Sequence, residues 1–261
     1  MKTCIIIPAR YASTRYPGKP LVPITARDGT TKTLIQRSWE RASQVRGVSR
    51  VVVATDDVRI REHAESFGAD VVMTSETCGN GTERCAEAIA SLGEDFGIFV
   101  NFQGDAPMTP PWFVEDLIEA MKKRPEVEVA TPVLNCDAET FSHFVKDRSE
   151  GRVGGTTAVF DAAMRALYFS KEVLPYSDPG THDEAHRFVY HHVGVYAYRK
   201  TALVSYPLME KRPLEKLEGL EQLRFLENGH TVLCVPVDAR GESFWELNNP
   251  VDVKRIEEHI K

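Results

Sequence analysis

The fold is decided at one junction, TCIIIPARYASTRYPGKPL (residues 3–21), where a strand meets a loop rich in positive charge. The apolar run at residues 3–8 predicts a strand that is buried on both faces. The loop at residues 10–21 holds two arginines, a lysine, two small hydroxyl side chains, a glycine and two prolines. Guanidinium and ammonium groups beside a glycine suit the oxygens of a polyphosphate. The loop lacks the Walker and GxGxxG spacings, so a solvated basic turn remains the alternative.

Apolar runs and amphipathic segments alternate through the first half of the chain. Strands are predicted at residues 50–56, 70–74 and 97–105, and helices at residues 33–45, 57–68, 81–93 and 110–123. This order predicts an α/β fold with a mostly parallel central sheet and helices on both faces. Ligands of such sheets bind beyond the carboxyl ends of the strands. The basic loop and QGD (residues 103–105) should therefore converge on one crevice.

The second half of the chain has a different hydrophobic pattern. Residues 154–161, 166–171 and 191–200 show more polar alternation, which predicts a smaller mixed-strand region. A leucine-rich helix at residues 214–229, a strand at 231–237 and a closing helix at 250–260 follow. Since no linker or repeat interrupts the chain, a single domain over residues 1–261 is expected.

Composition narrows the function classes. The chain has 261 residues and a formal net charge of −6, which disfavours a nucleic-acid binder. Five cysteines without a CxxC pair indicate reduced thiols and a cytoplasmic protein. No apolar stretch approaches the ~18 residues of a membrane span, so no membrane partner is expected.

Seven motifs together resemble the 3-deoxy-manno-octulosonate cytidylyltransferases. They are IIIPARYASTRYPGKPL, VVVATDD, GTERCAEA, VNFQGDAPM, ALYFSK, HHVGVYAYRK and PLEKLEGLEQLRFLENG, in order along nearly the whole chain. The resemblance implies a nucleotide-diphospho-sugar transferase-like fold and transfer of CMP from CTP to a sugar acid, with release of pyrophosphate, for lipopolysaccharide or surface glycan precursors. It also implies Mg²⁺ as cofactor and a homodimer, with the region from HHVGVYAY to LRFLENG, residues 191–229, as the expected interface.

The resemblance assigns residues to roles. Catalysis would rest on Arg10, Lys19 and Asp105. The nucleotide would be bound by Ala9, Arg10, Ser13, Arg15, Gly18, Lys19, Thr82, Arg84 and Gln103. The acceptor would be bound by Gln103, His191, Tyr196, Glu218 and Gln222. Magnesium would be held by Asp105 and Asn248, and the acceptor's own hydroxyl would attack the α-phosphorus in line. From the residues alone, Asp105 could instead cap a helix, and Thr82 could be a helix cap as well as a contact.

Four positions depart from the family pattern. Ala106 replaces the glutamate of QGDEP, Asn248 replaces a metal-binding aspartate, His191 replaces an arginine, and a lysine is missing near residue 157. Lost positive groups predict an acceptor of different charge, such as an 8-amino octulosonate, another nonulosonate or a different small acid. Because an amide removes a charge from the metal site, a CTP-binding protein without turnover is a further alternative. Of the adjacent His191 and His192, one is expected to be buried and the other to line the acceptor pocket.

Overall fold

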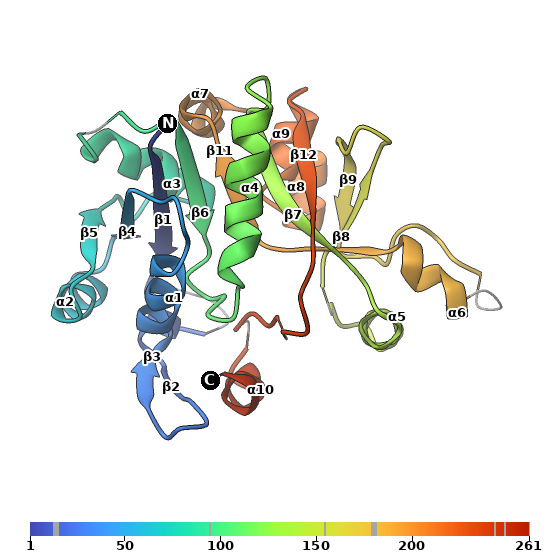
Figure 1. Ribbon diagram of the computed structural model, residues 1–261, viewed down its shortest axis with the longest axis horizontal. Coiled ribbons are helices and arrows are strands. Elements are labelled where there is room, and N and C mark those ends of the chain that lie inside the picture. The colour runs from blue at the N-terminus through green and yellow to red at the C-terminus, as the bar shows by residue number, and fades with distance from the viewer. Residues whose placement is uncertain are drawn as a thin grey trace.

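The computed structural model describes residues 1–12, 16–93, 95–153, 155–178, 182–242, 244–247 and 249–260. Within these residues, ten strands form one sheet, and helices pack on both of its faces (Figure 1). The strand order is β5-β4-β1-β6-β11-β7-β10-β8-β9, and β12 pairs with the other edge of β7. The predicted fold class is therefore confirmed.

The first half of the chain builds the parallel part of the sheet. β1 lies between β4 and β6, parallel to both, and β5 extends the sheet beyond β4. The strands are β1 (Thr3–Ala9), β4 (Arg50–Thr55), β5 (Asp70–Met73) and β6 (Ile98–Phe102). The helices are α1 (Leu34–Ser43), α2 (Val58–Ser66), α3 (Gly81–Ala88) and α4 (Pro111–Lys123). Every residue of β6 is buried, which explains its unbroken apolar run.

The second half adds the mixed part of the sheet. β10 (Tyr190–His192) and β11 (Val195–Tyr198) follow one edge of β7 (Val129–Asn135) and are antiparallel to it. β12 (Val232–Val237) runs parallel to β7, while β8 (Thr157–Phe160) and β9 (Ala166–Ser170) form a terminal hairpin. The helices here are α5 (Ala138–Ser149), α6 (His182–Ala185), α7 (Lys200–Ser205), α8 (Pro213–Glu218), α9 (Leu223–Glu227) and α10 (Asp252–His259). The shorter pieces are β2 (Pro23–Thr25), β3 (Thr31–Thr33) and the 3₁₀ turns Lys19–Leu21, Ile89–Ser91, His186–Phe188 and Tyr206–Leu208.

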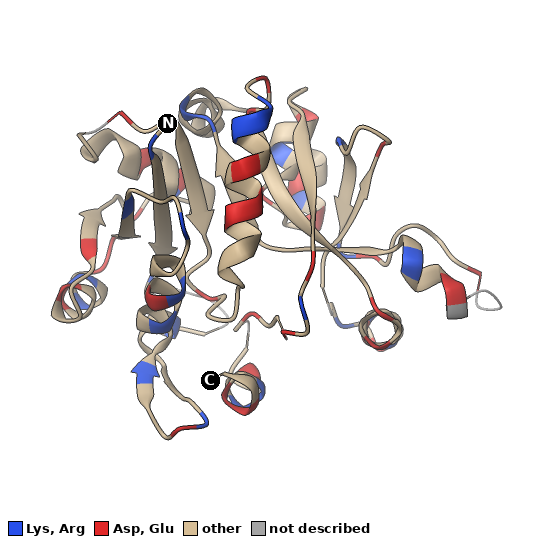
Figure 2. Ribbon diagram, viewed as in Figure 1, with Lys and Arg blue, Asp and Glu red and all other residues tan. Residues whose placement is uncertain are grey.

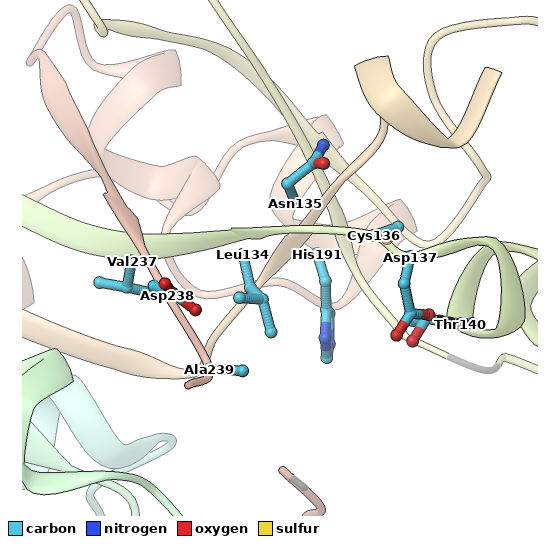
Figure 3. Close-up of a pocket in the computed structure, with 9 residues that line it drawn as sticks. All are labelled: Leu134, Asn135, Cys136, Asp137, Thr140, His191, Val237, Asp238 and Ala239. Carbon is cyan, nitrogen blue, oxygen red and sulfur yellow. Dashed lines mark hydrogen bonds between the residues drawn. The ribbon is translucent and has the colours of Figure 1, made fainter. Parts of the chain in front are cut away.

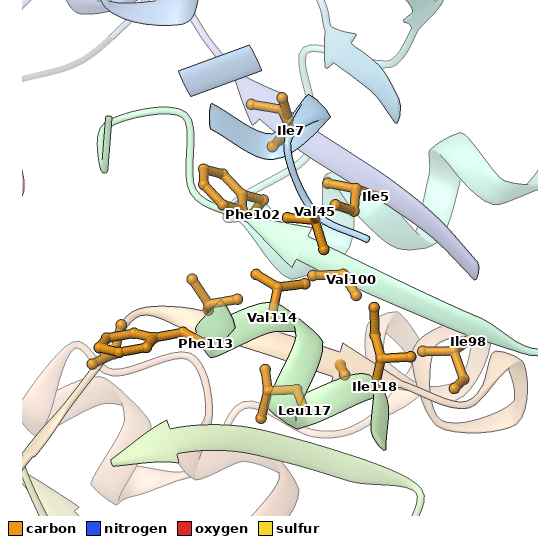
Figure 4. Packing of buried hydrophobic residues seen from close by; sticks show 14 of the residues in the cluster. Ile5, Ile7, Val45, Ile98, Val100, Phe102, Phe113, Val114, Leu117 and Ile118 are labelled. Atoms are coloured by element: carbon orange, nitrogen blue, oxygen red, sulfur yellow. The ribbon is translucent and has the colours of Figure 1, made fainter. Parts of the chain in front are cut away.

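The core consists of two apolar layers, one on each face of the sheet. Alternate residues of β1 divide between them: Ile5 and Ile7 belong to one layer, and Cys4 and Ile6 to the other. Figure 4 shows the first layer, in which the β1 and β6 side chains meet those of α4. This division is the period of two expected of a strand that is buried on both faces.

One expectation for the second half is wrong. The leucine-rich segment forms two short helices, because Gly219 adopts φ +64° and ends α8. Within the region expected to form the dimer interface, β11 pairs with β6 on one edge and with β7 on the other. Tyr196 and Tyr198 of β11 are buried inside the chain, so this strand offers no surface to a partner.

The C-terminal segment returns to the first half of the chain. Glu257 of α10 accepts a hydrogen bond from the Thr25 backbone N–H at 2.8 Å, and Leu247 and Ile256 share an apolar cluster with Ile24. Acidic and basic residues are interspersed over the helices and loops rather than gathered by sign (Figure 2). No helix in the described ranges has the length and apolar character required to cross a membrane.

Candidate active site

Three segments that are distant in sequence meet beyond the carboxyl ends of β1 and β6. Lys19 Nζ lies 2.5 Å from Asp105 Oδ2 and donates a second hydrogen bond to the carbonyl oxygen of Leu247 at 3.0 Å. The Leu247 backbone N–H donates in turn to the Asp105 carbonyl oxygen at 2.8 Å. The predicted convergence of the basic loop with QGD is confirmed. The C-terminal segment, residues 244–247, is the third, and it precedes Asn248, which the resemblance implies as a magnesium ligand.

Gly104 allows the turn after β6 to approach β1 closely. A Cβ atom built at Gly104 would lie 2.9 Å from the carbonyl oxygen of Pro8, a backbone atom that cannot swing aside. The Ser38 hydroxyl donates to the Gly104 carbonyl oxygen at 2.9 Å and ties the turn to α1. The turn after β6 therefore packs directly on β1, and Asp105 comes within reach of Lys19.

The basic loop is described in part. Ser13 and Arg15 lie outside the described residues, as does Asn248. Ala9 is buried at the end of β1, whereas Arg10 is exposed at the start of the loop. Gly18 has φ +70°, a conformation that favours glycine, and it precedes the 3₁₀ turn that carries Lys19.

Arg84 and Thr82 lie on α3, whose first residues face the same crevice. The N-cap is Asn80, not Thr82 as considered from the sequence; the Asn80 side chain accepts from the Glu83 backbone N–H. The Thr82 hydroxyl is 3.0 Å from the Tyr198 hydroxyl. Arg84 is 2% exposed and pairs with Asp56 after β4 at 3.0 Å. Arg84 also donates to the Thr74 hydroxyl, so its guanidinium joins the turns that follow β4 and β5.

A buried polar cluster lies beside QGD. Gln103 Nε2 donates to Glu221 Oε1 at 3.3 Å, and Glu221 Oε2 accepts from the Thr82 backbone N–H at 3.1 Å. The Tyr196 hydroxyl donates to Gln222 Oε1 at 3.0 Å. Burial raises the pKa of the Glu221 carboxyl. Three of the predicted acceptor residues therefore lie together, and Glu221 joins them.

Three buried amide atoms in this region have no hydrogen-bond partner among the described residues. They are the side chain of Asn101, at both polar atoms, and Nε2 of Gln222. Asn101 is 1% exposed and Gln222 is 2% exposed. A buried polar group without a partner costs about 1–3 kcal/mol, so these amides favour a polar partner such as buried water or a ligand atom.

Glu218, another predicted acceptor residue, is engaged elsewhere. Its carboxylate accepts from the Ser170 hydroxyl at 2.7 Å and from the Lys171 backbone N–H at 3.0 Å. These bonds hold α8 against the end of β9. Glu221, three residues later, is the glutamate that contacts Gln103, and sequence reasoning missed it. The signal was present in LEGLEQL, but it required the helix break at Gly219 to be known.

The two adjacent histidines have different surroundings. His192 is buried and lies 3.0 Å from the Thr131 hydroxyl, and burial lowers its pKa to about 3. His191 instead lines a pocket of about 280 Å³ at the carboxyl ends of β7 and β12 (Figure 3). Burial lowers the His191 pKa to about 4, so its imidazole is neutral near pH 7. The pocket is lined by Leu134, Asn135, Cys136, Asp137, Thr140, His191, Val237, Asp238 and Ala239.

The His191 pocket lies close to QGD. The ring of Phe244 packs against His191 with a centroid distance of 5.8 Å, and Leu247 bonds to Asp105. Three residues of extended chain span at most about 11 Å. Between them, Glu246 Oε1 lies near Gly194 and Gln103. The C-terminal segment therefore connects the pocket, the polar cluster and Asp105 in one short run.

Comparison with known proteins decides the family. A family model described as cytidylyltransferase matches residues 4–233. The 3-deoxy-manno-octulosonate cytidylyltransferase of Maricaulis maris is 42% identical over 98% of this chain and 96% of the relative. The chain belongs to this cytidylyltransferase family. The resemblance predicted from the motifs is confirmed, and this protein is a CTP-dependent nucleotidyltransferase.

Other relatives extend the comparison. The 8-amino-3,8-dideoxy-manno-octulosonate cytidylyltransferase of Shewanella amazonensis is 38% identical to this cytidylyltransferase over 100% of the chain and 99% of the relative. The solved structure of a CMP:2-keto-3-deoxy-manno-octonic acid synthetase complexed with CTP superimposes with a TM-score of 0.83. It is 33% identical and covers 99% of this chain and 98% of its own. The structure of 4-diphosphocytidyl-2C-methyl-D-erythritol synthase from Anaerococcus prevotii, at 12% identity and a TM-score of 0.61, shares the fold.

Proposed function

We propose that this cytidylyltransferase transfers CMP from CTP to a 3-deoxy-octulosonate-type sugar acid and releases pyrophosphate, in the synthesis of lipopolysaccharide or related surface glycans. One observation carries the proposal: Lys19 and Asp105 meet beside a buried polar cluster that has unpartnered amides. The names of the relatives support CTP as the nucleotide and an octulosonate-type sugar acid as the acceptor.

Binding of the CTP triphosphate would depend on positively charged side chains. Arg10 and Lys19 would bind the triphosphate, together with Ser13 and Arg15. Pyrophosphate gains negative charge as it leaves, and cations fixed beside it stabilise that charge more in the transition state than in the ground state. Among the described residues, Lys19 is a cation held at the turn after β1 in direct contact with Asp105.

Magnesium fits this arrangement. Among the described residues there is no group of three or more His, Cys, Asp or Glu side chains that could enclose a metal ion. Mg²⁺ often binds through one or two carboxylates together with substrate phosphates and waters. Asp105 would supply the carboxylate and Asn248 an amide oxygen. The bound ion would neutralise charge on the phosphates.

The acceptor would lie in the polar cluster. Gln222 Nε2 and the Asn101 amide require hydrogen-bond partners that the described chain does not provide, and the oxygens of a sugar acid supply them. Gln103 and Tyr196 border the same space, and Glu221 orients Gln103. An acceptor hydroxyl placed there could attack the α-phosphorus in line without a protein nucleophile.

The far end of the acceptor would reach the His191 pocket. Two carboxylates, Asp137 and Asp238, line this pocket, and none of its nine lining residues is a lysine or arginine. This charge balance favours an amino-bearing acceptor, the second candidate, over one with an additional negative group. The 8-amino octulosonate is the acceptor that fits this description.

A panel of acceptors tests both candidates. The purified protein is incubated with CTP, Mg²⁺ and either 3-deoxy-manno-octulosonate, its 8-amino analogue, a neuraminate or no acceptor, and pyrophosphate release is followed. Release with either octulosonate supports the proposed function, and faster release with the amino analogue supports the second candidate. CTP binding without release on any acceptor would contradict turnover.

We also infer a homodimer in the cytoplasm. Leu217 of α8 is 84% exposed and Leu208 is 85% exposed, and both lie in the region that the resemblance implies as the interface. The five free, buried thiols suit a reducing compartment. Light scattering should give twice the chain mass, and Leu217→Glu should lower it. An unchanged dimer would exclude this surface as the interface.

A further inference from the structure

The basic loop is closed at its base by Tyr11 and Gly18, here called the loop neck. The Gly18 backbone N–H donates to the Tyr11 carbonyl oxygen at 2.9 Å. The Tyr11 ring also packs on Gly18, since a Cβ built there would lie 3.1 Å from Tyr11 Cζ. Tyr11 and Gly18 are therefore held together on either side of residues 12–17.

Arg59 of α2 covers this neck from a different part of the chain. Its guanidinium carbon lies 3.4 Å from the centroid of the Tyr11 ring, a close cation–π contact. Asp57 fixes the guanidinium through two hydrogen bonds, from Nε at 3.0 Å and from Nη2 at 2.6 Å. Asp57 is itself held as the N-cap of α2. Two hydrogen bonds to one carboxylate orient the planar guanidinium over the ring.

We propose that Arg59 is a positioning residue for nucleotide binding. It clamps Tyr11 onto Gly18 and so holds these two residues of the basic loop together, without touching the nucleotide. Ordering a loop on binding costs conformational entropy, and joining two of its residues in advance lowers that cost. The inference rests on the proposed function, because it assumes that the loop binds the triphosphate of CTP.

A second arginine provides a matched control. Arg46 also makes a two-point ion pair with a carboxylate, Glu115, through Nε at 3.0 Å and Nη2 at 2.5 Å. The Arg46 side chain is 85% exposed and the Arg59 side chain 58% exposed. The two differ in that Arg59 lies over an aromatic ring of the loop neck. If only the ion pair mattered, both substitutions would act alike.

The experiment compares Arg59→Gln, Arg59→Lys, Arg46→Gln and Tyr11→Leu with the wild type. The dissociation constant for CTP is measured calorimetrically, and KM and kcat are measured with a saturating acceptor. Arg59→Gln should weaken CTP binding five- to tenfold and raise the KM for CTP, while kcat changes less than twofold. Arg59→Lys keeps a cation over the ring and should recover part of the affinity, whereas Arg46→Gln should match the wild type.

Hydrogen exchange at one amide reports the clamp directly. The Gly18 N–H should exchange at least fivefold faster in Arg59→Gln, while amides of α2 keep their rates because Asp57 still accepts from the backbone N–H of residue 59. Tyr11→Leu combined with Arg59→Gln should weaken binding no more than either alone. Equal CTP affinity in Arg59→Gln and the wild type, or additive losses, would overturn the inference. A wild type that does not bind CTP would instead contradict the proposed function.

Discussion

Gly104→Ala is the sharpest test of how the turn after β6 positions Asp105. The added methyl group would lie 2.9 Å from the Pro8 carbonyl oxygen, and ordinary contact begins at 3.4 Å. The two backbones must therefore separate by about 0.5 Å, which puts the cost in the range of overpacking, about 1–3 kcal/mol. The φ of Gly104 is not positive, so the backbone conformation itself adds no strain.

The same displacement should reduce activity. Asp105 follows Gly104 directly and is 2.5 Å from Lys19, so a shift of the turn moves the carboxylate. A misplacement of 1 Å can cost about 10²-fold in rate, and half of that displacement suggests a loss of about tenfold. Urea denaturation measures the free energy of unfolding, and pyrophosphate release measures kcat.

Gly97→Ala is the matched control, since Gly97 lies just before β6 as Gly104 lies just after it. A Cβ at Gly97 would meet the Met1 side chain, but this flexible terminal side chain can move away. Gly97→Ala should therefore lose less than about 0.5 kcal/mol and keep its activity. If Gly104→Ala behaves like Gly97→Ala in both assays, the close approach to Pro8 does not position Asp105.

Three further predictions concern charge and titration. Lys19→Met should lower kcat for pyrophosphate release about 10²–10³-fold with little change in thermal stability, because a fixed cation beside the leaving group is lost. The pKa values of His191 and His192 are lowered by burial, so below pH 6.5 the unfolded chain binds protons that the folded chain does not. The free energy of unfolding should therefore fall from pH 6.5 towards pH 4 by about 1.4 kcal/mol per pH unit for each histidine. Urea denaturation at several pH values should show that the free energy of unfolding of His192→Asn depends less steeply on pH than that of the wild type. Finally, burial raises the pKa of Cys78 to about 12, and all five thiols are buried, so Ellman's reagent at pH 8 should label the folded protein slowly and the denatured protein at five thiols.

The parallel half of the fold could be predicted because its strands carry their own signal. A strand such as β6 that is buried on both faces must be apolar throughout, and the helix after it must show one apolar stripe. The position of the ligand crevice could be predicted as well, since parallel strands place their carboxyl ends at one edge of the sheet. Lys19 and Asp105 could therefore be brought together without knowing any distance.

The second half was harder to predict because its pattern does not show which strands pair. HHVGVYAY predicts a strand, but not that β11 is inserted between β6 and β7. Placement in the middle of the sheet depends on long-range pairing, which local periodicity does not record. All four residues of β11 are for this reason buried in the core.

The acceptor side shows where local reasoning stops. A continuous helix would place Glu218 and Glu221 one above the other on the same face, so either could serve. Gly219 turns the chain through φ +64°, after which Glu218 faces β9 and Glu221 faces Gln103. One left-handed residue thus decides which of two identical side chains belongs to the site. A glycine at the end of a predicted helix marks the residue beyond which helical spacing no longer shows what shares a face.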